Sequence, residues 1–354
     1  MSAPDEATAS GVSWEPVVDE APTRLLGDDP TPEHGELPVV FTPDAPRGRH
    51  AGARERHLDV VVHPDADTLA EAAAARLLVR LIDLQSVRSP LHVVLTGGTV
   101  GIATLRAVAA SPVRHAVDWS GVHVWWGDER FVAADSPDRN ELQAREALLD
   151  ALPLPPANIH AMPAEGAAPD EDAAAAAYAH ELARFSARDD DVDEASPSGG
   201  VAPLDDAIAA GSGEAPGASS GTPLGLAGVT SRRVATSGAR PAVPEFDVLL
   251  LGMGPDGHVA SLFPGHATLH DEARTVVGEH DSPKPPPRRV SLTYPAIRAA
   301  REVWLVAAGE EKADAVAKAL SSGAAVDGTP AAGAYGTERT LWLVDLAAAR
   351  SIPA

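Results

Sequence analysis

Residues 246–265 read FDVLLLGMGPDGHVASLFPG, a short apolar run followed by a turn rich in glycine. The run from Phe246 to Leu251 is bounded by turn residues and is too short for a typical helix, so it predicts a strand buried on both faces. Glycine, proline and aspartate then turn the chain, and His258 follows. Ligands of α/β proteins gather at the carboxyl ends of parallel strands. The stretch therefore predicts a parallel sheet with chemistry at the tip of this strand.

Strands and helices alternate on both sides of this stretch. The expected strands are residues 57–62, 91–95, 122–126, a short segment near 159, 246–251, 273–277, 289–292, 302–307 and 340–344. The expected helices are 65–87, with Asp65 or Asp67 as N-cap, one that follows residues 96–99 and reaches about 110, 137–149, 170–185 and 310–320. Such alternation implies right-handed crossovers. The predicted fold is α/β: a doubly wound, mostly parallel sheet with helices on both faces, a Rossmann-like three-layer sandwich.

Two tracts interrupt the alternating pattern. Residues 1–56 are rich in Pro, Asp, Glu, Ala and Gly and show little periodicity, which predicts a disordered or loosely ordered extension. Residues from about 188 to 244 begin with DDDVDEASPSGG and form a tract too long for an ordinary loop, which predicts a solvated low-complexity insertion. The expected organisation is one α/β domain over 57–346, interrupted by this insertion, and a C-terminal tail over 347–354.

The composition excludes several classes of partner. The chain has 28 basic and 51 acidic residues and a formal charge of −23, which argues against binding to nucleic acid or anionic membranes. An anionic substrate would need a local basic pocket. The absence of cysteine excludes disulfides, a thiolate nucleophile and cysteine-based zinc sites. No secretory signal and no run of roughly 18 apolar residues is found, so the expected location is the cytoplasm.

A first cluster of unusual residues is LTGGT, residues 95–99. Adjacent glycines let backbone N–H groups converge on an anion, and the following helix adds the positive end of its dipole. The segment lacks the lysine of a P-loop and the glycine spacing of a dinucleotide fingerprint, so neither ATP nor NAD is indicated. Gly97, Gly98 and Thr99 are candidate anion-binding residues, with a purely structural turn as the alternative.

A second cluster is WWGDERFV, residues 125–132, which places charged groups at a strand end. Arg130 could clamp a phosphate through its planar guanidinium, and Asp128 could bind sugar hydroxyls or orient a catalytic base. Ordinary surface charge is the alternative interpretation. Asn140, in the nearby SPDRNE, is a further candidate, although a helix N-terminus alone would partly explain it.

The third cluster is the opening stretch, in which His258 is the candidate general base. An imidazole with an ordinary pKa near 6.5 is largely neutral at neutral pH and can accept a proton. A Ser–His–Asp triad is less favoured because no G-x-S-x-G elbow occurs, and a zinc site is not indicated because H-E-x-x-H is missing. General-base catalysis by His258 needs no metal and no organic cofactor.

Together the three clusters resemble the 6-phosphogluconolactonase family, within a larger group that includes the glucosamine-6-phosphate deaminases. LTGGT is similar to the family's L-S-G-G-S, WWGDER to W-x-D-E-R, and the opening stretch to G-x-G-x-D-G-H-x-A-S-L-F-P. RRVSLTYPAI and AAGEEKADAV look like two downstream family segments. The resemblance covers about 57–346 apart from the insertion. It departs at Val100-Gly101, where the family commonly has Thr-Pro, and at Ala161, where it has arginine.

The resemblance implies an enzyme of the oxidative pentose phosphate pathway, a carboxylic ester hydrolase that converts 6-phospho-D-glucono-1,5-lactone to 6-phosphogluconate. It implies that His258 activates water while Asp256 or Asp128 fixes its tautomer. It further implies phosphate-binding roles for Arg289 and Lys312. A small phosphosugar lactone is the expected substrate, and a functional link with glucose-6-phosphate dehydrogenase is expected.

Two other functions stay open from the sequence. The deaminase branch has D-E-Y where this chain has Asp128-Glu129-Arg130, and A-F-N-E-P where it has residues 260–264, so its ring-opening glutamate has no match there. A non-catalytic sugar-phosphate binder is the second alternative. The intact Asp-Gly-His triplet argues against it.

Overall fold

The computed structural model describes residues 39–41, 57–186 and 241–353. Most of the predicted extension and insertion lie outside these residues. Within the predicted extension, residues 39–41 form a short strand. At the end of the predicted insertion, Val243 is buried in the core. The described part of the chain therefore includes a few residues of both tracts.

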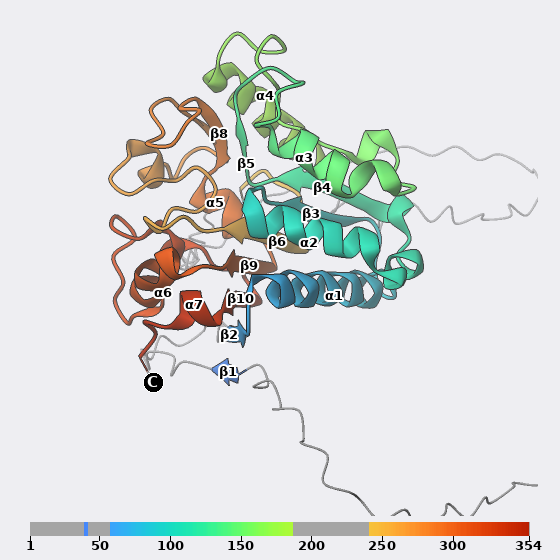
Figure 1. Ribbon diagram of the computed structural model, residues 1–354. Coiled ribbons are helices and arrows are strands. Elements are labelled where there is room, and N and C mark those ends of the chain that lie inside the picture. Colours follow the sequence, from blue (N-terminus) through green and yellow to red (C-terminus); the bar gives the residue numbers. More distant parts are fainter. Residues whose placement is uncertain (1–38, 42–56, 187–240, 354) are drawn as a thin grey trace, which may run out of the picture. The chain divides into compact units, whose positions relative to one another are not determined.

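Among the described residues, seven strands form a central sheet in the order β1-β2-β10-β9-β6-β3-β4 (Figure 1). Their bounds are β1 Val39–Phe41, β2 His57–His63, β10 Arg339–Asp345, β9 Glu302–Ala307, β6 Val248–Gly252, β3 Leu91–Leu95 and β4 Val122–Trp126. Every neighbouring pair is parallel except β1 and β2. The predicted α/β fold with a mostly parallel sheet is confirmed.

The helices follow the strands as the alternation requires. Their bounds are α1 Ala66–Gln85, α2 Gly98–Ala110, α3 Asn140–Ala147, α4 Glu171–Ser186, α5 Tyr294–Ile297, α6 Ala313–Leu320 and α7 Leu346–Ala349. Helices α1 and α2 pack side by side (Figure 1). Asp65 caps α1, because its Oδ1 accepts a hydrogen bond from the Thr68 N–H at 2.7 Å, whereas Asp67 lies inside the first turn. No helix in the described part of the chain is long and apolar enough to cross a membrane.

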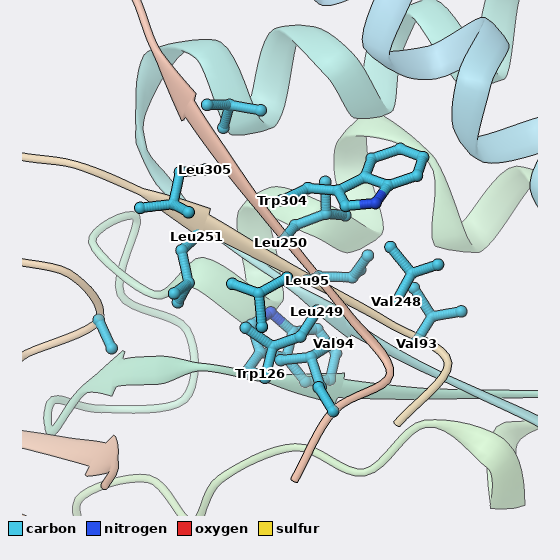
Figure 2. Close-up of a cluster of buried hydrophobic side chains, with 14 of the residues drawn as sticks. Val93, Val94, Leu95, Trp126, Val248, Leu249, Leu250, Leu251, Trp304 and Leu305 are labelled. Atoms are coloured by element: carbon cyan, nitrogen blue, oxygen red, sulfur yellow. The ribbon is translucent and has the colours of Figure 1, made fainter. Parts of the chain in front are cut away.

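Strand β6 lies inside the sheet, between β9 and β3. Val248, Leu249 and Leu251 are fully buried, and Figure 2 shows them among side chains of β3, β4 and β9. A fully buried leucine or valine stabilises the fold by about 1.5–3 kcal/mol. The apolar run of the opening stretch is therefore the expected strand buried on both faces, and its carboxyl end is rigidly held.

Some predicted elements differ from the structure. The segment near Ile159 makes a single bridge to Val124 and no strand. The helix predicted at 137–149 is confined to Asn140–Ala147. The helix predicted at 310–320 begins as a 3-10 turn, η6 Glu310–Lys312, after Gly309 at φ +103°. Part of the predicted tail is helical, as α7.

The largest difference is a second sheet. Strands β5 Asp128–Arg130, β8 Arg289–Leu292 and β7 Val276–Glu279 pair antiparallel in the order β5-β8-β7. The strands predicted at 273–277 and 289–292 were expected in the main sheet, the first is observed at Val276–Glu279, and no strand was predicted at Asp128. The carbonyl of Gly127 accepts a hydrogen bond from the Leu292 N–H, so the chain leaves β4 and joins the small sheet at this glycine.

A stack of histidines lies at the amino-terminal half of β3 and β4, away from the strand ends that carry the candidate residues. His92 and His123 are in register on the two strands. His92 accepts a hydrogen bond from the Trp125 indole at 3.2 Å, and His123 Nδ1 lies 2.9 Å from His160 Nε2. Burial, followed by the neighbouring histidines, lowers the pKa of His92 to about 3 and that of His123 to about 4.

This stack is expected to make stability fall as the pH is lowered. Below about pH 6.5 an unfolded chain binds protons at His92 and His123 that the folded protein does not accept. Each such site costs up to about 1.4 kcal/mol of unfolding free energy per pH unit until its folded-state pKa is reached. Urea unfolding of His123→Gln between about pH 6.5 and 4 should show a shallower pH dependence than the parent chain. The exposed His115→Gln is the control, and parallel curves for all three proteins would contradict the prediction.

Candidate active site

A pocket of about 310 Å³ opens at the carboxyl ends of β3, β6 and β9. Its wall includes all seven residues that the sequence assigned to substrate binding, together with His258 and Asp128. The seven are Gly97, Gly98, Thr99, Arg130, Asn140, Arg289 and Lys312. Asp256 is not on the wall and contacts His258 instead. The three sequence clusters therefore meet in one cavity.

A larger hollow of about 690 Å³ lies beside α4 and residues 272–276. About half of the residues around it are alanine or proline, and it holds none of the residues singled out above. No group of three or more histidine, cysteine, aspartate or glutamate side chains that could hold a metal occurs within the described ranges. The chemistry-bearing side chains are therefore concentrated in the smaller pocket.

The turn after β6 presents the imidazole of His258. The N–H of Gly254 donates to the His258 carbonyl at 3.0 Å, and Gly257 adopts φ +81°, which favours glycine. A Cβ added at Gly254 would lie 2.2 Å from Nδ1 and Cε1 of His258, so a side chain there would displace the ring. The tight turn and the close approach explain two glycines of the opening stretch.

Asp256 fixes the orientation of this imidazole. His258 Nδ1 donates to Asp256 Oδ1 at 2.5 Å, which leaves Nε2 with its lone pair. Burial opposes ionisation of Asp256, but the hydrogen bond and charge of His258 and the Lys284 ammonium hold the pKa of this carboxyl well below its usual range. Of the two carboxylates left open by the sequence, only Asp256 is within hydrogen-bond distance of His258.

Asp128 has a different set of contacts. Its Oδ2 accepts a hydrogen bond from the buried Ser261 Oγ at 2.6 Å and lies 4.0 Å from Arg289 Nη1. Ala260, the residue before Ser261, lines the pocket. Its φ of +49° is an uncommon conformation for alanine. Ser261 N–H also donates to Ser291 Oγ at 3.1 Å. Ser261 therefore ties the turn after β6 to β5 and β8, a link that the sequence analysis did not assign.

Glu129 organises the wall formed by β5 and α3. It is 1% exposed, and its Oε1 accepts from the N–H groups of Arg130 at 2.8 Å and Asn140 at 2.7 Å. Its Oε2 accepts from the Glu141 N–H at 2.9 Å, so this carboxylate caps α3. Burial raises the pKa of Glu129. Arg139 and the three N–H groups favour the charged form and lower the pKa, but their effect is smaller. The capping position explains why α3 begins at Asn140.

Asn140 and Gly97 pack closely at the anion-binding loop. Asn140 Nδ2 donates to the Asp128 carbonyl at 2.9 Å, and a Cβ on Gly97 would lie 1.9 Å from Asn140 Oδ1. Thr96 Oγ1 accepts from the Gly252 N–H at 3.0 Å, which joins the ends of β3 and β6. Gly101, where the family pattern has proline, has no room for a Cβ because the Thr96 carbonyl would lie 2.8 Å away. This departure therefore has a packing reason.

The basic side chains of the wall differ in how much of their hydrogen-bonding capacity remains. Arg289 donates from Nε to the Pro286 carbonyl at 3.0 Å and from Nη2 to the carbonyls of Lys284 and Pro285, leaving Nη1 toward Asp128. Arg130 donates from Nη1 to the Asp138 carbonyl at 2.6 Å. Lys312 stands at the end of η6, and burial is the main cause that lowers its pKa. In an acidic chain, these three cations form the local basic wall that an anionic substrate would require. Ala161 does not line this pocket.

Comparisons with known proteins show the family of the chain. A family model described as glucosamine-6-phosphate isomerases/6-phosphogluconolactonase matches residues 64–214 and 219–342. The chain is 49% identical over 296 residues to a 6-phosphogluconolactonase of Streptomyces coelicolor, covering 83% of this chain and 94% of that protein. It is 40% identical to one of Mycobacterium tuberculosis, covering 83% and 98%. The solved 6-phosphogluconolactonase of Trypanosoma brucei superposes with a TM-score of 0.58 at 27% identity, covering 83% and 98%. The chain therefore belongs to the family of glucosamine-6-phosphate isomerases and 6-phosphogluconolactonases.

Proposed function

We propose that this protein hydrolyses 6-phospho-D-glucono-1,5-lactone to 6-phosphogluconate, a step of the oxidative pentose phosphate pathway. The observation that carries the proposal is that His258, paired with Asp256 behind it, lines the same pocket as a basic, glycine-lined cradle. Relatives that share up to 49% identity over most of the chain are 6-phosphogluconolactonases, which supports the same activity here.

In the proposed reaction, His258 acts as general base on water. Nε2 takes a proton from water as its oxygen attacks the lactone carbonyl carbon, C1, and a tetrahedral oxyanion forms. When the bond between C1 and the ring oxygen breaks, the imidazolium returns the proton to that oxygen. The products are a carboxylic acid, which ionises, and a free hydroxyl group. Asp256 holds the Nδ1 tautomer throughout and stabilises the transient imidazolium.

The phosphate of the substrate is proposed to lie in the cradle opposite this pair. Gly98 and Thr99 begin α2, so their N–H groups and the helix dipole favour an anion there. Arg130, Arg289 Nη1 and Lys312 supply positive charge from the other walls. Binding a remote phosphate orients C1 against the water, which makes the attack effectively intramolecular.

Two further parts of the proposal concern the setting of the enzyme. The cysteine-free sequence fits a reducing compartment, which supports a cytoplasmic location. A functional link with glucose-6-phosphate dehydrogenase follows if the lactone is the substrate, since that enzyme acts immediately before it in the pathway.

The test uses the purified full chain and three substrates. We expect a clear acceleration of 6-phosphogluconolactone hydrolysis over the spontaneous rate, much weaker action on unphosphorylated gluconolactone, and no ammonia from glucosamine 6-phosphate. Ammonia release without lactone hydrolysis would favour the deaminase alternative. Binding of 6-phosphogluconate with no acceleration would favour the non-catalytic binder, and either result would overturn the proposal.

A further inference from the structure

Lys284 approaches the His258–Asp256 pair from a part of the chain to which the sequence analysis gave no role. It lies between β7 and β8, and its Nζ is 3.4 Å from His258 Nδ1 and 3.5 Å from Asp256 Oδ1. Its side chain is 37% exposed, and it does not line the pocket. The ammonium therefore meets the pair on the Nδ1 side of the ring, while Nε2 is left for the substrate.

The backbone of Lys284 is held in place by three hydrogen bonds. Its carbonyl accepts from Arg289 Nη2 at 3.1 Å and from Ser282 Oγ at 2.9 Å. Its N–H donates to Ser282 Oγ at 3.2 Å. Prolines 285–287 follow directly and restrict the chain further. The backbone from which the ammonium extends is thus held by the folded segment, next to the His258–Asp256 pair.

The ammonium cannot be a hydrogen-bond donor to Nδ1, because Nδ1 carries the proton that it donates to Asp256. The short approach is therefore an electrostatic contact between a cation and the imidazole. A nearby cation disfavours the imidazolium, whereas the Asp256 carboxylate favours it. The two partners act on His258 in opposite directions.

Among the described residues, no other charged group makes a hydrogen bond or ion pair with His258. The charged side chains that share its pocket come from β5, β8 and η6, namely Asp128, Arg130, Arg289, Glu311 and Lys312. The ring of Phe263 covers one side of the imidazole at 4.5 Å, with His266 beyond it. Asp256 and Lys284 are thus the charges placed closest to the proposed base.

We propose that Lys284 is a positioning residue of the reaction proposed above: its ammonium steers the Asp256 carboxylate against Nδ1 and keeps His258 neutral and ready to accept a proton from water. The inference rests on the proposed function of His258. The same cation makes the imidazolium a stronger acid once it has formed, which assists return of the proton to the ring oxygen. The lysine thereby raises the unprotonated fraction of His258 and favours the second proton transfer, whereas Asp256 offsets the weaker basicity of His258 in the first.

The test compares Lys284→Met and Lys284→Arg with the parent chain across the pH profile of kcat/KM, after the spontaneous rate is subtracted. The exposed Lys318→Met on α6 is the matched control. Loss of the cation should move the acid limb of Lys284→Met upward by about one pH unit, since a charge at this distance shifts a neighbouring pKa by about 1–3 units and exposure weakens it. Activity below the limb should fall about tenfold, with little change on the alkaline plateau, and Lys284→Arg should restore the parent profile.

A merely structural role would give a different result. An equal loss at every pH, or an unmoved acid limb in Lys284→Met, would overturn the proposal. The imidazole C–H resonances of His258, assigned by their absence in His258→Gln, provide a readout that needs no turnover. Their titration midpoint should rise in Lys284→Met. If that midpoint rises while no protein hydrolyses lactone, the electrostatic role of Lys284 stands and the proposed function fails.

Discussion

Replacing His258 with glutamine is expected to lower kcat for lactone hydrolysis by about 10²–10⁴-fold, the usual contribution of a positioned general base. Glutamine is a polar side chain of similar size, but its amide nitrogen does not occupy the place of Nδ1, which donates to Asp256 in the parent chain. It has no nitrogen able to take a proton from water at neutral pH. The pocket walls and the cradle are untouched, so the affinity for 6-phosphogluconate should change little. Steady-state kinetics and calorimetric titration with the product measure the two quantities separately.

His115→Gln is the matched control, because His115 is an exposed histidine in the turn after α2 and does not line the pocket. It should keep the parent rate. A further variant, Asp256→Asn, should retain substrate binding but lose rate, because an amide does not hold the required tautomer or stabilise an imidazolium. Parent-like turnover in His258→Gln would remove the histidine from the mechanism, whatever Asp256→Asn does.

Local sequence was sufficient for six of the seven described strands of the central sheet, since β1 lies in the tract predicted as a loosely ordered extension. Val248 to Leu251 is apolar throughout and is followed by glycine, and such a run has few alternatives to a buried strand. The turn after it could be predicted because the glycines at 252, 254 and 257 favour a tight turn over a helix or a strand. The same logic held for residues 91–95 and 122–126, whose predicted bounds match β3 and β4.

The small sheet and its contacts could not be predicted in this way. Strand β5 is three charged residues that carry no strand signal, and it forms because Gly127 and Leu292 meet across 165 residues of chain. The bond between Ser261 and Asp128 spans a sequence separation of 133. Lys284 reaches His258 only because prolines and Arg289 shape the segment before β8. Each depends on long-range packing, which a single sequence does not encode locally.

Arg289 illustrates how a correctly located residue can have a second role. The sequence analysis gave it to the phosphate, and it does line the pocket. Three of its donated hydrogen bonds nevertheless go to the carbonyls of residues 284–286. Substitution of Arg289 would remove the donors to these partly buried carbonyls and would loosen the segment that carries Lys284. A change in KM for such a variant would therefore not isolate phosphate binding.

Lys312 offers a cleaner test of the phosphate cradle. Its side chain lines the pocket from η6 and is partly buried, and this burial is the main cause that lowers its pKa. A dianionic phosphate placed beside it would replace that lost hydration with a charge-assisted hydrogen bond, which contributes about 1.5–3 kcal/mol. We expect Lys312→Met to lower kcat/KM for the phosphorylated lactone by about 10–100-fold.

The loss should appear mainly as a higher KM, because the phosphate is remote from C1 and is bound equally before and during the reaction. Unphosphorylated gluconolactone makes no such contact, so its slow hydrolysis should be the same in Lys312→Met and in the parent chain. Lys318→Met, on the exposed side of α6, should behave as the parent with both substrates. If Lys312→Met slows the hydrolysis of both lactones by the same factor, Lys312 supports the fold of the pocket and does not bind the phosphate. Phosphate binding would then have to be assigned to the α2 N-terminus and Arg130.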